Sequence, residues 1–231
     1  MVESTNSVFT DESLQFLADL DQNNNREWFQ ANKSRYESLI LQPALDLISQ
    51  LEKPIQRISP MLDVQAKRSG GSLMRIYRDT RFSPNKTPYK TNVGIHFRHT
   101  VGRDVHAPGL YIHIQPKQSF IGAGIWMPDG PTLAKLRTSI DQQPKRWSRI
   151  LNAKSFAESM TLDTDSIKTV PRGYDKNHPL IDILRRKSHV GAYALSDAEV
   201  VSGKLPSIAV DKFKSAKAFM ALLCESIGLP F

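Results

Sequence analysis

The chain has 231 residues, of which 40% are hydrophobic and 23% are charged, and these ordinary globular values allow a substantial core. One cysteine, Cys224, excludes an internal disulfide and a thiolate-rich metal site, and it favours a reducing cytoplasm. No apolar run approaches the roughly 20 residues that span a bilayer, and the first residues lack the basic start and apolar stretch of a signal peptide, so we expect a cytoplasmic protein with no membrane contact.

The net charge of +8 is unevenly distributed along the chain. Residues 1–63 hold 5 basic and 10 acidic side chains, residues 64–118 hold 10 and 2, and residues 119–231 hold 16 and 11. The basic stretch indicates a surface for an anion or a nucleic acid. It is equally consistent with an acidic first segment that packs against the basic second one.

Three helices are predicted before Pro60. Thr10 caps the first, about residues 11–20, and the asparagines at 23–25 end it. A second starts near Arg26 and carries Asn32 on its apolar stripe, and a third has Pro43 in its first turn. The third helix is expected to bury Ala44, Leu47, Ile48, Leu51, Ile55 and Ile58.

From about residue 73 the apolar residues alternate, which predicts strands. Residues 92–98, 110–115 and 119–126 each place apolar side chains on one face. The short links between them predict an antiparallel meander with helices on one face. His96, Arg98, Tyr111 and His113 would then share the other face.

The remaining sequence predicts mostly helix. Pro131, Pro144 and Pro179 each open a helix, and Ser207 begins a last one that Gly228 ends. The sequence also predicts a strand at 189–195, a short strand around 167–170, and a capping box formed by Ser196 and Glu199. We therefore predict one α+β domain, residues 1–231, with a central, mainly antiparallel sheet (about residues 73–126) packed against N-terminal and C-terminal helices.

The densest positive charge lies in RIYRDTRFSPNKTPYKTN, residues 75–92. If residues 75–81 are extended, Arg75, Tyr77, Asp79 and Arg81 share a face, and Asp79 can pair with Arg81 or Arg75. Two prolines then place two turns among lysines and hydroxyl groups. Cations held in a stiff segment predict an anion site, because arginine forks match carboxylate and phosphate oxygens.

The sequence thus predicts binding of a phosphate- or carboxylate-bearing ligand, either an anionic small molecule or a phosphorylated macromolecule, at a rigid basic strand-loop, residues 75–91. The predicted ligand-binding residues are Arg75, Arg78, Asp79, Arg81, Lys86, Tyr89 and Lys90. Asp79 would orient an arginine, and Tyr89 would add a hydroxyl group or a stacking face. Any catalysis there would come from stabilising anionic charge, since no nucleophile is evident. The alternatives are nucleic-acid binding through the same surface, with aromatic rings between the cations, and a purely structural motif in a protein-interaction domain.

Several stretches also resemble a known family. The family is a widespread uncharacterised one of bacterial and fungal proteins, known as a domain of unknown function. The stretches that resemble it are NNNREWF (23–29), the basic motif (75–92), GAGIWMP (122–128), PRGYDKNHPLIDILRRKS (171–188) and LSDAEVVS (195–202). The resemblance covers nearly the whole chain. It implies one compact domain of about this length, and it implies no activity, cofactor or catalytic residue.

The other candidate groups favour ordinary structural roles. His96 and His113 lack the nearby carboxylates of a metal site, and Gly122-Ala123-Gly124 lacks the third glycine of a dinucleotide loop, so we predict neither a metal nor a cofactor. Trp126 is interpreted as an edge of the core, and Cys224 as a buried, inert thiol. Arg185-Arg186-Lys187 is interpreted as a solvated helix end.

Overall fold

A computed structural model describes residues 7–81, 83–101 and 107–231. Its centre is one six-stranded antiparallel sheet with strand order β1-β2-β3-β4-β6-β5. The strands are β1 (Leu62–Asp63), β2 (Val93–His99), β3 (Gly109–Ile114), β4 (Ser119–Ile125), β5 (Thr161–Leu162) and β6 (His189–Leu195). Helices precede and follow the strands of this antiparallel sheet along the chain, which confirms the α+β class.

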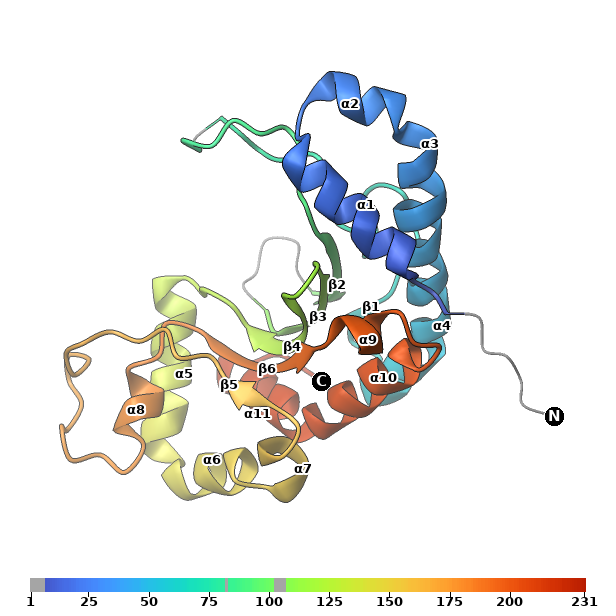
Figure 1. The fold of residues 1–231 in the computed structure, drawn as a ribbon. Helices are drawn as coiled ribbons and strands as arrows, with labels where there is room; N and C mark the ends of the chain where they lie inside the picture. Colours follow the sequence, from blue (N-terminus) through green and yellow to red (C-terminus); the bar gives the residue numbers. More distant parts are fainter. Residues whose placement is uncertain (1–6, 82, 102–106) are drawn as a thin grey trace.

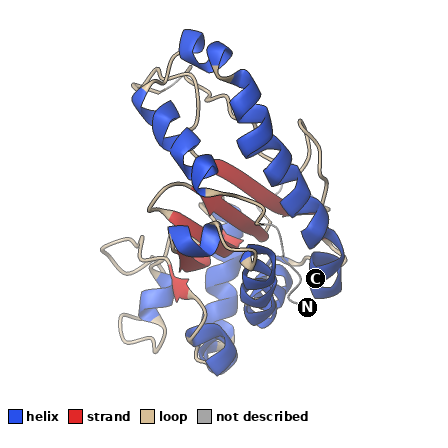
Figure 2. Ribbon diagram, turned by 45° about the vertical axis from the view of Figure 1, so that its right-hand side comes forward, coloured by secondary structure: helices blue, strands red, loops and turns tan. Residues whose placement is uncertain are grey.

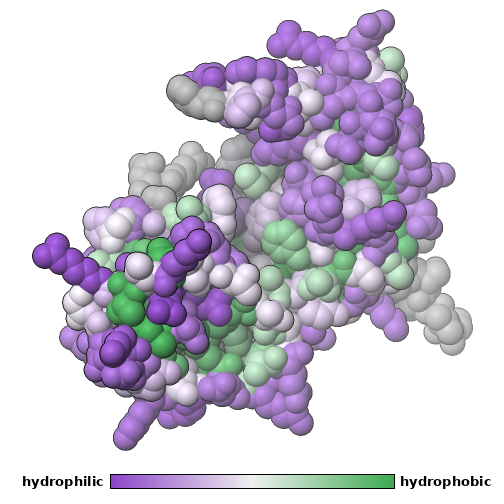
Figure 3. Space-filling view, turned by 60° about the vertical axis from the view of Figure 1, so that its left-hand side comes forward, coloured by the Kyte–Doolittle hydropathy of each residue, from purple (hydrophilic) through white to green (hydrophobic). Residues whose placement is uncertain are grey.

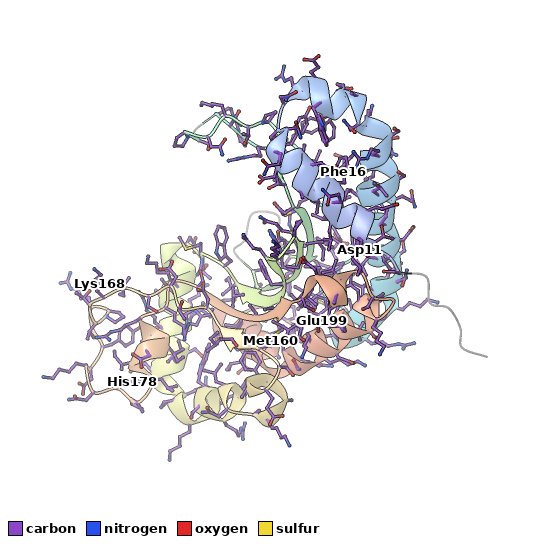
Figure 4. All side chains as sticks on the ribbon, in the orientation of Figure 1. Asp11, Phe16, Met160, Lys168, His178 and Glu199 are labelled. Carbon is purple, nitrogen blue, oxygen red and sulfur yellow. The ribbon has the colours of Figure 1, made fainter. Side chains whose placement is uncertain are left out.

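The N-terminal helices form an arm that rises from one end of the sheet (Figure 1). The arm consists of α1 (Asp11–Gln22), α2 (Arg26–Ala31), α3 (Lys33–Tyr36), a π-helical turn η1 (Glu37–Leu41) and α4 (Gln42–Ile58). Thr10 and Ser13 form a capping box at the start of α1. Phe16, labelled in Figure 4, joins the arm together through ring contacts with Trp28 and Tyr36.

The C-terminal helices cover the lower part of the molecule. They are α5 (Gly130–Gln142), α6 (Pro144–Leu151), α7 (Lys154–Ala157), α8 (Ile181–Leu184), α9 (Asp197–Val200), α10 (Leu205–Ser215) and α11 (Lys217–Ile227). Ser196 and Glu199 form the predicted capping box of α9. Gly228, in the left-handed conformation at φ 83°, ends α11 as predicted.

One face of the sheet carries the core. Register pairs Val93 with Ile114, Ile95 with Ile112 and Phe97 with Leu110, so all six side chains point to the same face and are buried. Helix α4 packs on β2, and α10 and α11 pack on β4. The opposite face, with Gly94, His96, Tyr111, His113 and Phe120, faces the open side of the molecule between the arm and the lower helices (Figures 1 and 2).

Two predicted helices are interrupted. The stretch after Arg26 breaks at Asn32, whose side-chain amide donates to the Trp28 carbonyl at 2.9 Å and so competes with the backbone. The last helix is two helices that meet at Ala216, where the Ser215 hydroxyl donates to the Lys212 carbonyl at 2.7 Å. Apolar spacing continues across both breaks, which is why the sequence pattern did not locate them.

The strand predictions need two corrections. The sheet extends beyond residues 73–126, because β1 pairs with β2 and β6 pairs with β4 over seven residues. The short strand expected around 167–170 is wrong: β5 takes the free edge of β6 instead, with Thr161 opposite Ala192. Lys168, labelled in Figure 4, lies in a loop. Alternation of apolar residues within one segment does not show which distant segment will pair with an edge strand of the sheet.

Candidate functional site

The basic strand-loop, residues 75–91, is an irregular hairpin rather than a regular strand. A single antiparallel bridge joins Tyr77 to Tyr89. The Arg78 amide donates to the Pro88 carbonyl at 2.9 Å, and the Lys90 amide donates to the Ile76 carbonyl at 2.7 Å. The hairpin projects beside α1 and α2 over the open side of the molecule, and hydrophilic side chains cover the overhang in Figure 3.

An asparagine of the N-terminal arm forms hydrogen bonds with the backbone of this hairpin. The Asn24 side chain donates to the Tyr89 carbonyl and accepts from the Tyr89 amide, both at 3.0 Å, as a neighbouring strand would. The Tyr89 ring stacks on Phe29 of α2 with 4.1 Å between ring centroids. The chain around 24–29 and the hairpin around 77–89 therefore form one surface.

A hollow of about 510 Å³ lies between these two segments, and we call it the basic hollow. Its lining contains three cations, Arg26, Arg78 and Lys86, and no carboxylate among the described residues. The full lining is Asn24, Asn25, Arg26, Gln30, Tyr77, Arg78, Thr80, Lys86, Pro88 and Tyr89. Three like charges around a concave surface make an electropositive site.

Two of these cations are held in place by neutral groups. Arg78 Nη1 donates to the Thr87 hydroxyl at 2.6 Å, and Thr87 in turn bonds to the Asn85 side chain. Lys86 Nζ donates to the Thr80 carbonyl at 2.9 Å. Arginine has five N–H donors and lysine three, so both cations keep donors for a further acceptor while their positions are restricted.

The other predicted residues lie outside the basic hollow. Arg81 forms a two-pronged ion pair with Asp79, with N–O distances of 2.7 and 3.0 Å, and these bonds lower the pKa of the Asp79 carboxyl to about 2. This ion pair restricts the Arg81 side chain, but Asp79 and Arg81 are both exposed and neither lines the basic hollow. Arg75 is absent from its lining as well.

Lys90 lies in an adjoining hollow of about 190 Å³ that shares Asn24, Arg78 and Tyr89 with the basic hollow. Burial, with the nearby charge of Arg75, lowers the pKa of Lys90. This second hollow includes the carboxylate of Asp21, so it is less suited to an anion.

Packing of the acidic first segment against the basic second one explains little of this charge. An ion pair joins Glu37 to Arg68 at 3.7 Å, outside the strand-loop. Within the described residues, Arg78, Lys86 and Lys90 have no ion pair with an acidic side chain of the arm.

Arg26, Asn24 and Asn25 were missed as site residues by the sequence reasoning. About fifty residues separate them from the hairpin, and charge counting alone does not bring them together. A usable signal was present: three consecutive asparagines, beyond what one helix stop requires, directly precede an arginine.

The open face of the sheet holds a separate concavity of about 680 Å³, which we call the sheet-face cavity. In Figure 3 the surface is hollowed between the overhang and the lower helices. The cavity brings His96, Arg98, Tyr111 and His113 together, as predicted. It is lined by Met74, His96, Arg98, His99, Ala107, Gly109, Tyr111, His113, Phe120, Gly122, Ala123, Gly124, Ile125, Trp126 and Val190.

Two histidines in the cavity are neutral at physiological pH. Burial, with the charge of Arg98, lowers the pKa of His96 to about 4, and burial also lowers the pKa of His113. Arg98 Nε donates to His96 Nδ1 at 3.2 Å, so the neutral ring carries its proton on Nε2. His113 Nε2 lies 2.9 Å from Gln115 Oε1, which leaves its Nδ1 to accept from Tyr111 or Asn92.

Three other interpretations are settled by burial. Trp126 is wrong as a core edge, because 75% of it is exposed and it lines the sheet-face cavity. Cys224 is buried as predicted, and burial raises the pKa of its thiol to about 12. Arg185 and Arg186 are half-buried rather than fully solvated, and Lys187 pairs with Asp165 at 2.9 Å.

Within the part of the chain that the structure describes, no three His, Cys, Asp or Glu side chains gather as metal ligands would. No helix among those same residues has the length and apolar character to cross a bilayer.

Comparisons with known proteins give one match. A family model described as "Conserved hypothetical protein (DUF2461)" matches residues 12–221. No curated protein and no solved structure matches the chain.

Proposed function

The chain belongs to the DUF2461 family of conserved hypothetical proteins, and we propose that it binds an anionic ligand, bearing a phosphate or carboxylate group, in the basic hollow. The observation that carries the proposal is the lining of three cations without a described carboxylate. Arg26, Arg78 and Lys86 repel one another, and an anion between them converts that repulsion into attraction. Arg78 is half-buried, whereas Arg26 and Lys86 are exposed and open to a ligand from solvent.

Preorganisation also supports the proposal. Arg78 is held by Thr87 and Lys86 by the Thr80 carbonyl, and Asn24 fixes the hairpin that carries both. A ligand therefore meets cations whose side-chain freedom is already reduced, which lowers the entropic cost of binding. Phosphate and carboxylate oxygens match the remaining N–H donors of both side chains.

The proposal assigns the ligand contacts to Arg26, Arg78, Lys86 and Tyr89, and it gives Arg75, Asp79, Arg81 and Lys90 supporting roles at most. Such a site stabilises negative charge, which is also what it would contribute to any reaction. We also propose the cytoplasm as the compartment of the protein, because a chain with one cysteine forms no internal disulfide.

Nucleic-acid binding is the second candidate, and one observation favours it. Tyr77 is 52% exposed beside Arg78, so it offers a ring on which a base could stack. The concave shape of the basic hollow suits one anionic group better than a stripe of phosphates.

Calorimetric titration with inorganic phosphate and with citrate, at constant ionic strength, tests the proposal. We expect Arg78→Gln and Lys86→Gln each to weaken binding about tenfold, because each loses a charge-assisted hydrogen bond worth about 1.4 kcal/mol or more. Arg81→Gln is the matched control: it removes the same charge from the same hairpin outside the hollow.

The proposal is wrong if neither anion binds, or if Arg81→Gln weakens binding as much as Arg78→Gln does. A single-stranded oligonucleotide that binds with a steep salt dependence, while both anions fail, would favour the nucleic-acid alternative instead.

A further inference from the structure

The sheet-face cavity has the lining of a small-molecule site rather than of an unfinished core. Six of its lining residues carry rings: His96, His99, Tyr111, His113, Phe120 and Trp126. Its volume of about 680 Å³ lies within the usual range for ligand pockets, which combine apolar walls with a few polar groups.

The rings form a connected wall. His113 stacks on Phe120 with 4.8 Å between centroids, and Tyr111 lies 5.7 Å from Phe120 and 6.0 Å from His96. Trp126, at the end of β4, stands clear of this group with most of its surface exposed. The wall and Trp126 both line the cavity, and aromatic side chains pack against a flat ring in offset or edge-to-face arrangements.

Two glycines of the sheet allow neighbouring side chains to pack close to its surface beneath the cavity. A Cβ at Gly94 would lie 2.7 Å from the Tyr111 hydroxyl, and one at Gly109 would lie 2.5 Å from His96 Nε2. These two glycines thus let Tyr111 and His96 lie over the sheet. At Gly122 a Cβ would meet its neighbours at 3.7 Å or more, which is ordinary van der Waals contact, and Gly122 lines the cavity.

The polar groups of the cavity include hydrogen-bond donors of His96 and Arg98, and Arg98 carries a positive charge. The neutral His96 ring presents Nε2–H, and Arg98 keeps its Nη donors after bonding to His96 through Nε. The described lining contains no carboxylate, and burial keeps the His96 and His113 rings uncharged. Arg98 therefore sets the sign of charge that the cavity prefers.

We infer that the sheet-face cavity is a second binding site, for a planar aromatic small molecule that carries one carboxylate group. The ring packs within the cavity against the aromatic side chains that line it, Trp126 among them, and the carboxylate accepts from Arg98 and His96. This inference is independent of the basic hollow, whose lining shares no residue with the cavity.

Calorimetric titration of the full chain with 2-naphthoate tests the inference. The probe should bind the wild type at least about tenfold more tightly than cyclohexanecarboxylate, which has the same charge without a flat ring. Gly122→Leu fills the cavity and should weaken 2-naphthoate binding at least about tenfold, whereas Gly122→Ala should change it less than about threefold. Arg98→Gln should cost about tenfold, and Arg78→Gln should change nothing.

A second pair of variants covers a folding failure of Gly122→Leu. Trp126→Ala removes an exposed ring from the cavity, and Met127→Ala removes its exposed neighbour, which does not line it. Only Trp126→Ala should weaken binding.

The inference is overturned if 2-naphthoate shows no saturable binding, or if Trp126→Ala and Met127→Ala bind it equally. Loss of binding in Arg78→Gln would place the probe in the basic hollow, and would also contradict the inference.

Discussion

His189 shows how one buried side chain couples stability to pH. It is 1% exposed at the start of β6, and burial, with the charge of Arg186, lowers its pKa to about 4. An unfolded histidine has a pKa of about 6.5. Between these values the unfolded chain binds more protons than the folded one, so the free energy of unfolding falls as the pH drops through this window.

His189→Leu should therefore reduce the pH dependence of stability. The wild type should lose about 2 kcal/mol through this group between about pH 7 and about pH 5, and the variant should retain that amount. Urea unfolding at both pH values measures the difference. His96 contributes in the same direction, so the slope becomes smaller without reaching zero; an unchanged slope would contradict the assignment.

Single residues in the basic segment behaved differently from their sequence pattern. Alternation placed Arg75, Asp79 and Arg81 together, and the pairing of Asp79 with Arg81 is confirmed. The cations that reach the basic hollow are Arg78 and Lys86, because the chain there is an irregular hairpin and not a strand of period two. Sequence predicted the segment but could not assign its faces.

At the scale of elements, Asn24 joins the N-terminal arm to the basic hairpin. Asn24→Ala removes two hydrogen bonds to the Tyr89 backbone, which should cost about 2 kcal/mol. We expect faster hydrogen exchange at the Tyr89 amide and faster proteolysis within residues 75–91, because the hairpin loses its tie.

Asn25→Ala is the matched control for Asn24→Ala. Asn25 caps α2 by accepting from the Trp28 amide at 2.9 Å, so its loss should cost about 1 kcal/mol while the hairpin stays protected. Equal exchange rates at Tyr89 in the two variants would show that the hairpin is held by other contacts.

At the scale of the whole molecule, strand β6 connects distant parts of the chain. It pairs with β4 over seven residues and so joins the meander to the C-terminal helices. Gly124 lies at this seam with φ at 142°, and a Cβ there would collide with the His189 carbonyl oxygen. A side chain is excluded both by this backbone conformation and by the neighbouring strand.

One cooperative domain remains a prediction, and Gly124→Ala tests it. The variant should lose at least about 2 kcal/mol, and native-state hydrogen exchange should show the same loss in α4 and in α11. Gly122→Ala, whose Cβ makes only ordinary contacts, should leave both helices unchanged. A loss confined to α11 would indicate two independently folding units.

The α+β class, the meander and its buried face, the caps at Thr10 and Ser196, and the position of the basic segment all followed from the residue pattern. Those features depend on spacing and capping within a few residues, which local sequence records. The folded chain was needed to place Arg26 beside Arg78, to add β6 to the edge of the meander and to leave Trp126 exposed over a cavity. These arrangements depend on contacts between residues far apart in the chain, where the packing of whole elements decides which surfaces meet.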